Sequence, residues 1–340
     1  MPLSDRALGA ALDAIVARTD RAERLARDPV RALHRYRDPL DQELVGLLAS
    51  CLAFGNAGVI VRKLDEVLTR LGERPVVAAS SPEGLERALR GFRHRVYGGD
   101  EVARLLAGAR RVQIEAGTLG DRFAAELRAS GGQLRPALGA FVGALRQAGG
   151  LDGPELGRGA RHILPDIEGA SACKRLLLYL RWMVRPADGV DLGLWADRVP
   201  ARLLIVPLDV HLHRLALNLG LTERQAASWR AAEEVTARLS RLDPSDPVRY
   251  DFALCHMGMA GDCPSLADAR RCEGCGVKPL CRHWEGVRGA GEGRATGPRK
   301  AGGQRIAGPH AVAEPRKAEP RKAAGRPGRR VALRVLVRGA

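Results

Sequence analysis

Apolar side chains recur at helical spacing through most of the first 150 residues. Within residues 4–28, one helical face carries Leu8, Leu12, Ile15 and Val16. Ser4 is the expected N-cap of this helix. Residues 41–54 carry a broader apolar stripe formed by Leu44, Leu47, Leu48, Cys51 and Leu52. Such a wide stripe predicts a helix that is buried in the core.

The same spacing continues beyond a glycine-rich break at residues 55–58, which is typical of a turn between helices and would also let a ligand approach the backbone closely. Further helices are expected at residues 59–71, 83–90, 100–116, 119–129, 134–148 and 171–185. The alternation typical of β-strands is nearly absent, and aromatic residues make up only 4% of the chain. The sequence therefore predicts an all-α fold.

Composition indicates a globular body followed by a basic tail. The 340 residues are 45% hydrophobic, which is enough for a sizeable core over residues 1–285. No apolar run reaches the roughly 18 uncharged residues that a membrane span requires. No secretory signal opens the chain. We therefore expect a soluble protein of the cytoplasm that is not associated with a membrane.

Residues 286–340 carry fourteen Lys and Arg against three acids, and they contain a repeat of Ala-Glu-Pro-Arg-Lys. Large apolar side chains are scarce before Val331, so this tail cannot bury enough surface to offset the entropy of ordering. We expect it to be disordered. It would hold the protein near DNA or RNA by counterion release, although a solvated extension without a partner has the same composition.

Four cysteines with the spacing C-x8-C-x2-C-x5-C form the most specific motif of the chain. They are Cys263, Cys272, Cys275 and Cys281, within an expected cluster loop over residues 255–285. Four thiolates suit either a tetrahedral Zn²⁺ or a [4Fe-4S] cluster. Disulfides are disfavoured because the sequence indicates a reducing compartment.

A short turn, Leu164-Pro-Asp-Ile-Glu-Gly169, separates two expected helices, and Ser171 is available to cap the second of them. A helix-hairpin-helix of this kind directs backbone N–H groups at a DNA phosphate without reading the base sequence. An ordinary turn between two helices has the same pattern.

The helix expected at residues 171–185 carries Lys174 in its first turn, where a partly buried amine would serve as a nucleophile. Lys174, Arg181 and Arg185 are spaced by seven and four residues and so share one face. Leu176, Leu177, Leu180, Met183 and Val184 are expected to face the core. We expect Ser171, Arg175, Arg181 and Arg185 to contact DNA. A solvated helix face is the alternative for these charged residues.

Asp209 stands in an apolar run, just after Pro207-Leu208 and before Val210-His211. A carboxylate at this point caps the following helix in the ordinary structural interpretation. In an apolar cleft it would instead activate an amine or water, or stabilise a developing cation. His211 and His213 follow closely, and histidines at a helix start more often pack or hydrogen-bond than bind a metal ion.

The order of hairpin, lysine, Leu-Asp-Val-His and four cysteines resembles the helix-hairpin-helix DNA glycosylase superfamily of endonuclease III over residues 40–285. Within it, several segments resemble an uncharacterised bacterial family. These segments are Ser171–Arg175, Leu180–Arg185, Val190–Trp195, Pro207–His211 and Asp246–Ala253. The resemblance implies a two-lobed helical fold and a C-terminal [4Fe-4S] loop held by the four cysteines.

On this resemblance, Asp209 matches the catalytic aspartate and Lys174 the catalytic lysine. The implied function is base-excision repair: a DNA glycosylase, with abasic-site lyase activity through a lysine Schiff base, acting on a damaged base flipped out of double-stranded DNA. An oxidised base is one possible target. The resemblance also implies a monomeric protein associated with the nucleoid of the bacterial cytoplasm.

Three departures from the superfamily pattern keep an alternative open. Asp166 and Glu168 replace the usual glycines of the hairpin, Lys174 lies thirty-five residues before Asp209, and the first cysteine interval is x8 where endonuclease III has x6. A non-catalytic DNA-binding Fe–S protein of the same fold is the alternative function. Zn²⁺ is the alternative metal.

Overall fold

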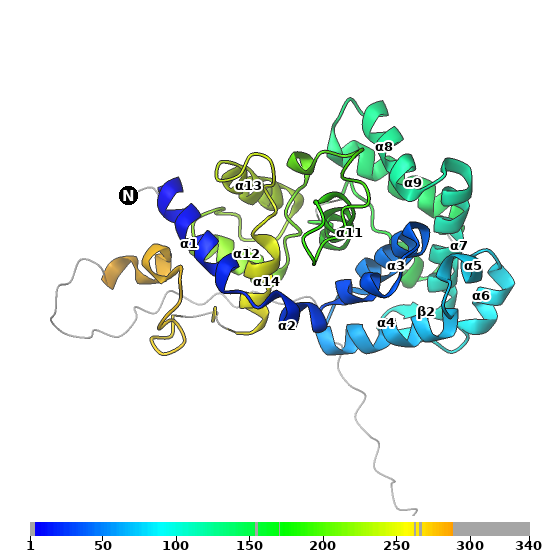
Figure 1. Cartoon of the computed structure of the whole chain (residues 1–340), viewed down its shortest axis with the longest axis horizontal. Coiled ribbons are helices and arrows are strands. Elements are labelled where there is room, and N and C mark those ends of the chain that lie inside the picture. The colour runs from blue at the N-terminus through cyan, green and yellow to red at the C-terminus, as the bar shows by residue number, and fades with distance from the viewer. Residues whose placement is uncertain (1–3, 154–155, 170, 262, 265–266, 288–340) are drawn as a thin grey trace, which may run out of the picture. The chain divides into compact units, whose positions relative to one another are not determined.

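A computed structural model describes residues 4–153, 156–169, 171–261, 263–264 and 267–287, and almost all of its regular structure is helical (Figure 1). The helices are α1 (Asp5–Arg18), α2 (Arg21–Ala26), η1 (Pro29–Arg35), α3 (Pro39–Leu52), α4 (Ala57–Leu71), α5 (Pro75–Ala79), α6 (Pro82–Ala88), α7 (Gly99–Ala116), α8 (Leu119–Ala129), α9 (Leu134–Gly149), α10 (Arg158–Ile163), α11 (Lys174–Val184), η2 (Ala201–Leu203), α12 (Val210–Asn218), α13 (Trp229–Ser240), α14 (Asp251–Met259), η3 (Lys278–Leu280) and η4 (Arg282–Val287). The η elements are 3-10 helices. A two-residue antiparallel pair, β1 (Arg93–His94) and β2 (Tyr97–Gly98), is a small exception. The prediction of an all-α fold is confirmed.

The chain divides into two units, residues 1–293 and residues 294–340. The predicted disordered tail lies outside the described residues from residue 288 onward. Among the helices of the described part, none is both long enough and apolar enough to cross a bilayer.

The helix expected over residues 4–28 is in fact two helices. It begins as predicted, because the Ser4 hydroxyl accepts a hydrogen bond from the N–H of Ala7 at 3.3 Å. Thr19 then adopts an extended backbone and ends α1. The carboxylate of Asp20 accepts the N–H of Glu23 at 2.9 Å and so begins α2. Periodicity alone missed this break because a side-chain cap competes with continuation of the helix.

The predicted core helix α3 is buried as expected. Leu44, Leu47, Leu48, Cys51 and Leu52 are all 0% exposed. α11 packs against α3, and a Cβ atom at Gly46 would lie 2.9 Å from Cε of Met183. Since real Cβ contacts are essentially never that short, glycine at position 46 permits this close helix packing. The five apolar residues of α11 that were expected to face the core are also buried.

A buried carboxylate, Glu43, fixes α3 against the start of α8. Its Oε2 accepts the N–H of Leu119 at 2.8 Å, and its Oε1 accepts the N–H of Gly120 at 2.9 Å. The indole N–H of Trp195 donates to the same Oε1 at 2.7 Å. An acidic side chain at a helix N-terminus is favoured by the helix dipole. Through these hydrogen bonds Glu43 joins α3, the start of α8 and the segment of Trp195 in the core.

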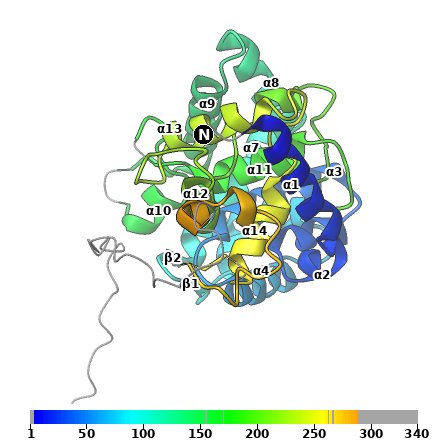
Figure 2. The same ribbon diagram turned by 90° about the vertical axis from the view of Figure 1, so that its left-hand side faces the viewer.

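A second packing unit brings the late helices together. α14 packs on α12 and on α1, and both views show these three helices side by side (Figures 1 and 2). The starts of α11 and α12 and one face of α14 are far apart in the sequence, and all three line one cleft.

Candidate active-site cleft

A cleft of about 600 Å³ opens between five segments of the chain. It is lined by the α2–η1 junction, the turn between α3 and α4, the start of α11, the start of α12 and one face of α14. The glycine-rich break contributes Phe54, Gly55 and Asn56, and Gly55 has a φ of +103°. The Asn56 side chain accepts the N–H of Val59 and caps α4. The break is therefore a helix-helix turn and also part of the cleft wall.

Lys174 is the first residue of α11 and lines the cleft. Its ammonium has no hydrogen-bond or ion-pair partner among the residues that the structure describes. The start of α11 differs from the prediction, because Ser171 is not its cap. Cys173 is the N-cap residue, with a left-handed backbone (φ +48°), and its N–H donates to Oγ of Ser171 at 3.2 Å. Ser171 instead pairs with Ser228 in an isolated β-bridge. α11 therefore begins at Lys174, three residues later than predicted.

Asp209 lines the same cleft and caps α12. Its Oδ1 accepts the N–H groups of His211 and Leu212 at 2.9 and 2.8 Å. Its Oδ2 accepts the thiol of Cys255 at 3.4 Å. Asp209 therefore caps α12 and also lines the cleft, so both positions considered for it from the sequence are found.

The two histidines of this segment differ. His213 is buried, and its Nε2 lies 2.8 Å from the carbonyl oxygen of Arg224, which is the hydrogen-bonding role expected for it. His211 lines the cleft.

Five further titratable residues of the cleft were missed by sequence reasoning: Arg27, Asp28, Asp251, Cys255 and His256. Asp251 lies in the segment 246–253 that carries the family resemblance, so a signal for it was present. Burial raises the pKa of Asp251, and the charge of Arg181 opposes this rise. Nε2 of His256 lies 3.1 Å from Oδ2 of Asp28. Burial works to raise the pKa of Asp28, but that hydrogen bond lowers it, and the net shift is downward.

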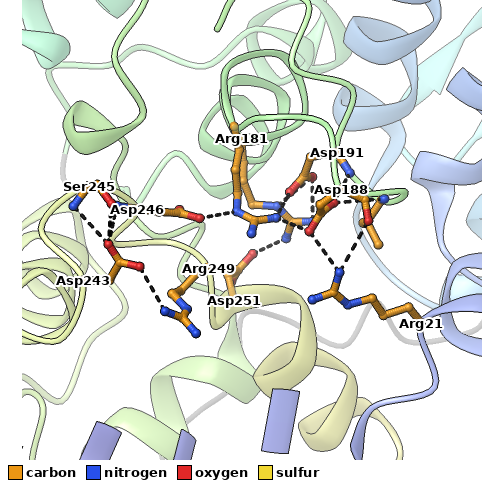
Figure 3. A network of polar contacts seen from close by, with 11 residues as sticks. Arg21, Arg181, Asp188, Asp191, Asp243, Ser245, Asp246, Arg249 and Asp251 are labelled. Carbon is orange, nitrogen blue, oxygen red and sulfur yellow. Dashed lines mark hydrogen bonds and ion pairs between the residues drawn. The ribbon is translucent and has the colours of Figure 1, made fainter. Parts of the chain in front are cut away.

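The structure corrects the expectation for Arg181, which is 3% exposed and not on a solvated face. Its guanidinium donates to Oδ1 of Asp191 at 3.0 and 3.1 Å and to Oδ2 of Asp251 (Figure 3). Burial alone would lower the pKa of Arg181, but the two carboxylates raise it above its ordinary value. Arg181 is therefore the centre of a buried ionic network and is not available to a DNA phosphate at the surface.

Arg185 and Arg175 also have partners within the chain. Arg185 donates to Asp246 at 2.7 Å, to Asp188 at 2.6 Å and to Asp191 at 2.9 Å. Arg175 donates to the carbonyl oxygen of Cys51 at 2.9 Å and to the hydroxyl of Tyr97. These contacts join α11 to neighbouring segments, and the DNA contacts expected of both arginines stay a prediction.

The predicted hairpin, residues 164–169, joins α10 to the segment before α11. Arg135 of α9 donates to the carbonyl oxygens of Ile167 and Gly169 at 2.9 and 3.1 Å. Arg146 donates to the carbonyl oxygen of Leu164 at 2.7 Å. The side chains of Asp166 and Glu168 are exposed. The hairpin is therefore fastened to α9 by its carbonyl groups and presents two acids to solvent.

The four predicted ligand cysteines line one small cavity, together with Leu215, Asn218, Val277 and Trp284. The side-chain amide of Asn218 lies 3.8 Å from Sγ of Cys263, and Arg214 donates to the carbonyl oxygen of Cys263 at 2.6 Å. Within the described part of the chain, no three Cys, His, Asp or Glu side chains already adopt the spacing of a metal site. The cavity lies at the end of α12 opposite to Asp209.

Comparison with known proteins adds one match. A family model described as protein of unknown function (DUF2400) matches residues 28–260, which include the whole cleft except Arg27 and end three residues before Cys263. No curated protein and no solved structure matches the chain.

Proposed function

The chain belongs to the family described as protein of unknown function (DUF2400), and we propose that it is a DNA base-excision glycosylase with abasic-site lyase activity. One observation carries the proposal: Lys174 and Asp209, selected separately from the sequence, line the same cleft. An amine without a partner in the same cleft as a fixed carboxylate offers the two groups that Schiff-base chemistry uses.

The electrostatics of the cleft also support a nucleic-acid substrate. Three α-helices begin at its wall: α4 is capped by Asn56 and α12 by Asp209, whereas α11 has no side-chain cap. Unpaired backbone N–H groups and the positive end of the helix dipole favour anions at a helix N-terminus. A phosphate beside a flipped nucleotide would meet the uncapped start of α11 while the base enters the cleft, since the base and C1′ cannot be reached inside the stack.

In the proposed reaction, the neutral amine of Lys174 attacks C1′ of the flipped nucleotide. The bond from C1′ to the base breaks, and its electron pair leaves with the base. The carboxylate of Asp209 offsets the positive charge that develops on the sugar. The amine gives a proton to the departing base, and the sugar ring then opens as its oxygen takes up a proton from water. The protonated Schiff base that results on Lys174 loses a proton at C2′, and β-elimination expels the 3′ phosphate.

We further propose that the four cysteines hold a [4Fe-4S] cluster in the cavity that they share, with Zn²⁺ as the alternative. Four sulfur donors beside the apolar groups of Leu215, Val277 and Trp284 fit such a group. Its role would be structural, because the cavity lies at one end of α12 and Asp209, where the proposed reaction takes place, lies at the other end.

Replacing Cys272 with Ser is expected to remove one ligand and to lower metal content and thermal stability, because the free energy of metal binding in such loops is largely free energy of folding. Iron and zinc analysis, visible absorption and a melting curve measure this. Cys51→Ala, at a buried cysteine outside the cavity, is the matched control and should keep the metal. Full metal content and an unchanged melting curve for Cys272→Ser would exclude Cys272 as a ligand.

The proposed function is tested by incubating the protein with duplexes that carry 8-oxoguanine, an oxidised pyrimidine, uracil or an abasic site. We expect base release or strand cleavage on at least one duplex. Asp209→Asn should reduce base release at least about tenfold while DNA binding persists, because the amide keeps the cap of α12 but loses the charge. Binding without base release or cleavage on every duplex would favour the non-catalytic DNA-binding alternative.

A further inference from the structure

The two carboxylate oxygens of Asp209 are held by different groups. Oδ1 accepts two backbone N–H groups of α12, whereas the thiol of Cys255 is the donor to Oδ2 within the described part of the chain. We propose that Cys255 is a positioning residue, whose thiol orients the carboxylate of Asp209 in the cleft. This inference rests on the proposed function, and it assigns a role to a cysteine that the motif of four does not include.

The environment of Cys255 keeps its sulfur protonated. Burial raises the pKa of this thiol well above its ordinary value, and the charges of Asp209 and Asp251 raise it further. At neutral pH the sulfur is therefore a hydrogen-bond donor and not a thiolate that would repel the carboxylate.

Contacts on two sides fix the helix that carries Cys255. One turn earlier, Asp251 accepts a hydrogen bond from Arg181 of α11. The next residue, His256, lies 3.1 Å from Asp28 at the start of η1. Because α11 also carries Lys174, the contact between Arg181 and Asp251 links the helix of the thiol to the helix of the amine.

Gly258 shows how closely α14 approaches the start of α12. A Cβ atom at this position would lie 2.7 Å from Cβ of His211, nearer than real Cβ atoms come. His211 follows Asp209 by two residues. Because residue 258 is a glycine, α14 can approach the start of α12 closely enough for the thiol of Cys255 to reach Oδ2 of Asp209. Gly258→Ala should separate the two helices and lengthen the contact between Cys255 and Asp209.

The contact can be tested without any activity, through the S–H stretching band in the infrared spectrum of the full chain. Cys255→Ser identifies the band by removing it. Asp209→Asn should shift that band to higher frequency, because the amide nitrogen opposite the thiol cannot accept its proton. Cys51→Ala removes a different band and is the control. A Cys255 band at the same frequency in wild type and Asp209→Asn would overturn the proposal.

Kinetics test the consequence for the reaction. A hydrogen bond to a charged group corresponds to about tenfold or more in rate, so Cys255→Ala should lower kcat by that factor and leave KM for DNA unchanged. Cys255→Ser should restore much of the rate because a hydroxyl also donates. Cys51→Ala should match wild type.

An active wild-type protein whose rate survives Cys255→Ala would overturn the positioning role and leave the proposed function intact. Wild-type protein inactive on every duplex would overturn the proposed function, whereas the infrared band decides independently whether the thiol holds Asp209.

Discussion

Lys174→Gln is expected to lose covalent trapping on DNA completely while the protein stays folded. Borohydride reduces a Schiff base between an amine and the opened sugar to a stable bond, and an amide cannot form that Schiff base. Lys174 is only partly buried and stands at the start of α11, so the substitution leaves no buried charge without a partner. Trapping is measured as a protein–DNA adduct on a denaturing gel, and folding by a melting curve.

Lys63→Gln is the matched control for this experiment. Lys63 pairs with Glu66 at 2.7 Å on α4 and does not line the cleft, so its loss should leave trapping at the wild-type level. If trapping survives Lys174→Gln and disappears in Lys63→Gln, the nucleophile has been assigned to the wrong lysine.

Arg181→Met is expected to cost about 3–5 kcal/mol of folding free energy, because it leaves the buried carboxylate of Asp251 without its cation and leaves Asp191 with Arg185 alone. Asp191 and Asp251 are 1% and 2% exposed, so water cannot replace the guanidinium. The loss should be smaller in mild acid, since burial raises the pKa of Asp251 and protonation neutralises its stranded carboxylate. Urea unfolding at pH 7 and pH 5 measures both effects.

Arg249→Met provides the comparison, because the side chain of Arg249 is 36% exposed and pairs with Asp243 and Asp13 near the surface. Exposed ion pairs contribute about 0–1 kcal/mol, so this variant should be close to wild type. Equal stability of Arg181→Met and wild type would show that the network around Arg181 in Figure 3 is not a structural centre.

The sequence was a good guide to which helices are buried in the core. The stripe on α3 and the apolar face of α11 were predicted correctly, because periodicity reports which face of a helix is covered. The spacing of Lys174, Arg181 and Arg185 correctly placed them on one face. It could not show what covers that face, since the partners of Arg181 lie 10 and 70 residues further along the chain.

The same distinction explains which cleft residues were found. Lys174 and Asp209 belong to recognisable local patterns at helix starts. Cys255 and Asp28 have no pattern of their own and enter the cleft only because α14 packs on α12 and η1 lies beside them. The break at Thr19–Asp20 and the late start of α11 were missed because side-chain caps and a left-handed Cys173 override helical periodicity.

The most direct test of the central claim is to identify the residue that becomes attached to DNA. Wild-type protein would be incubated with the lesion-bearing duplexes and borohydride, digested, and the modified peptide sequenced by mass spectrometry. The proposal predicts one adduct, on Lys174. An adduct on another amine, or neither adduct nor base release on any duplex, would contradict the claim that Lys174 and Asp209 form the active site of a DNA glycosylase with lyase activity.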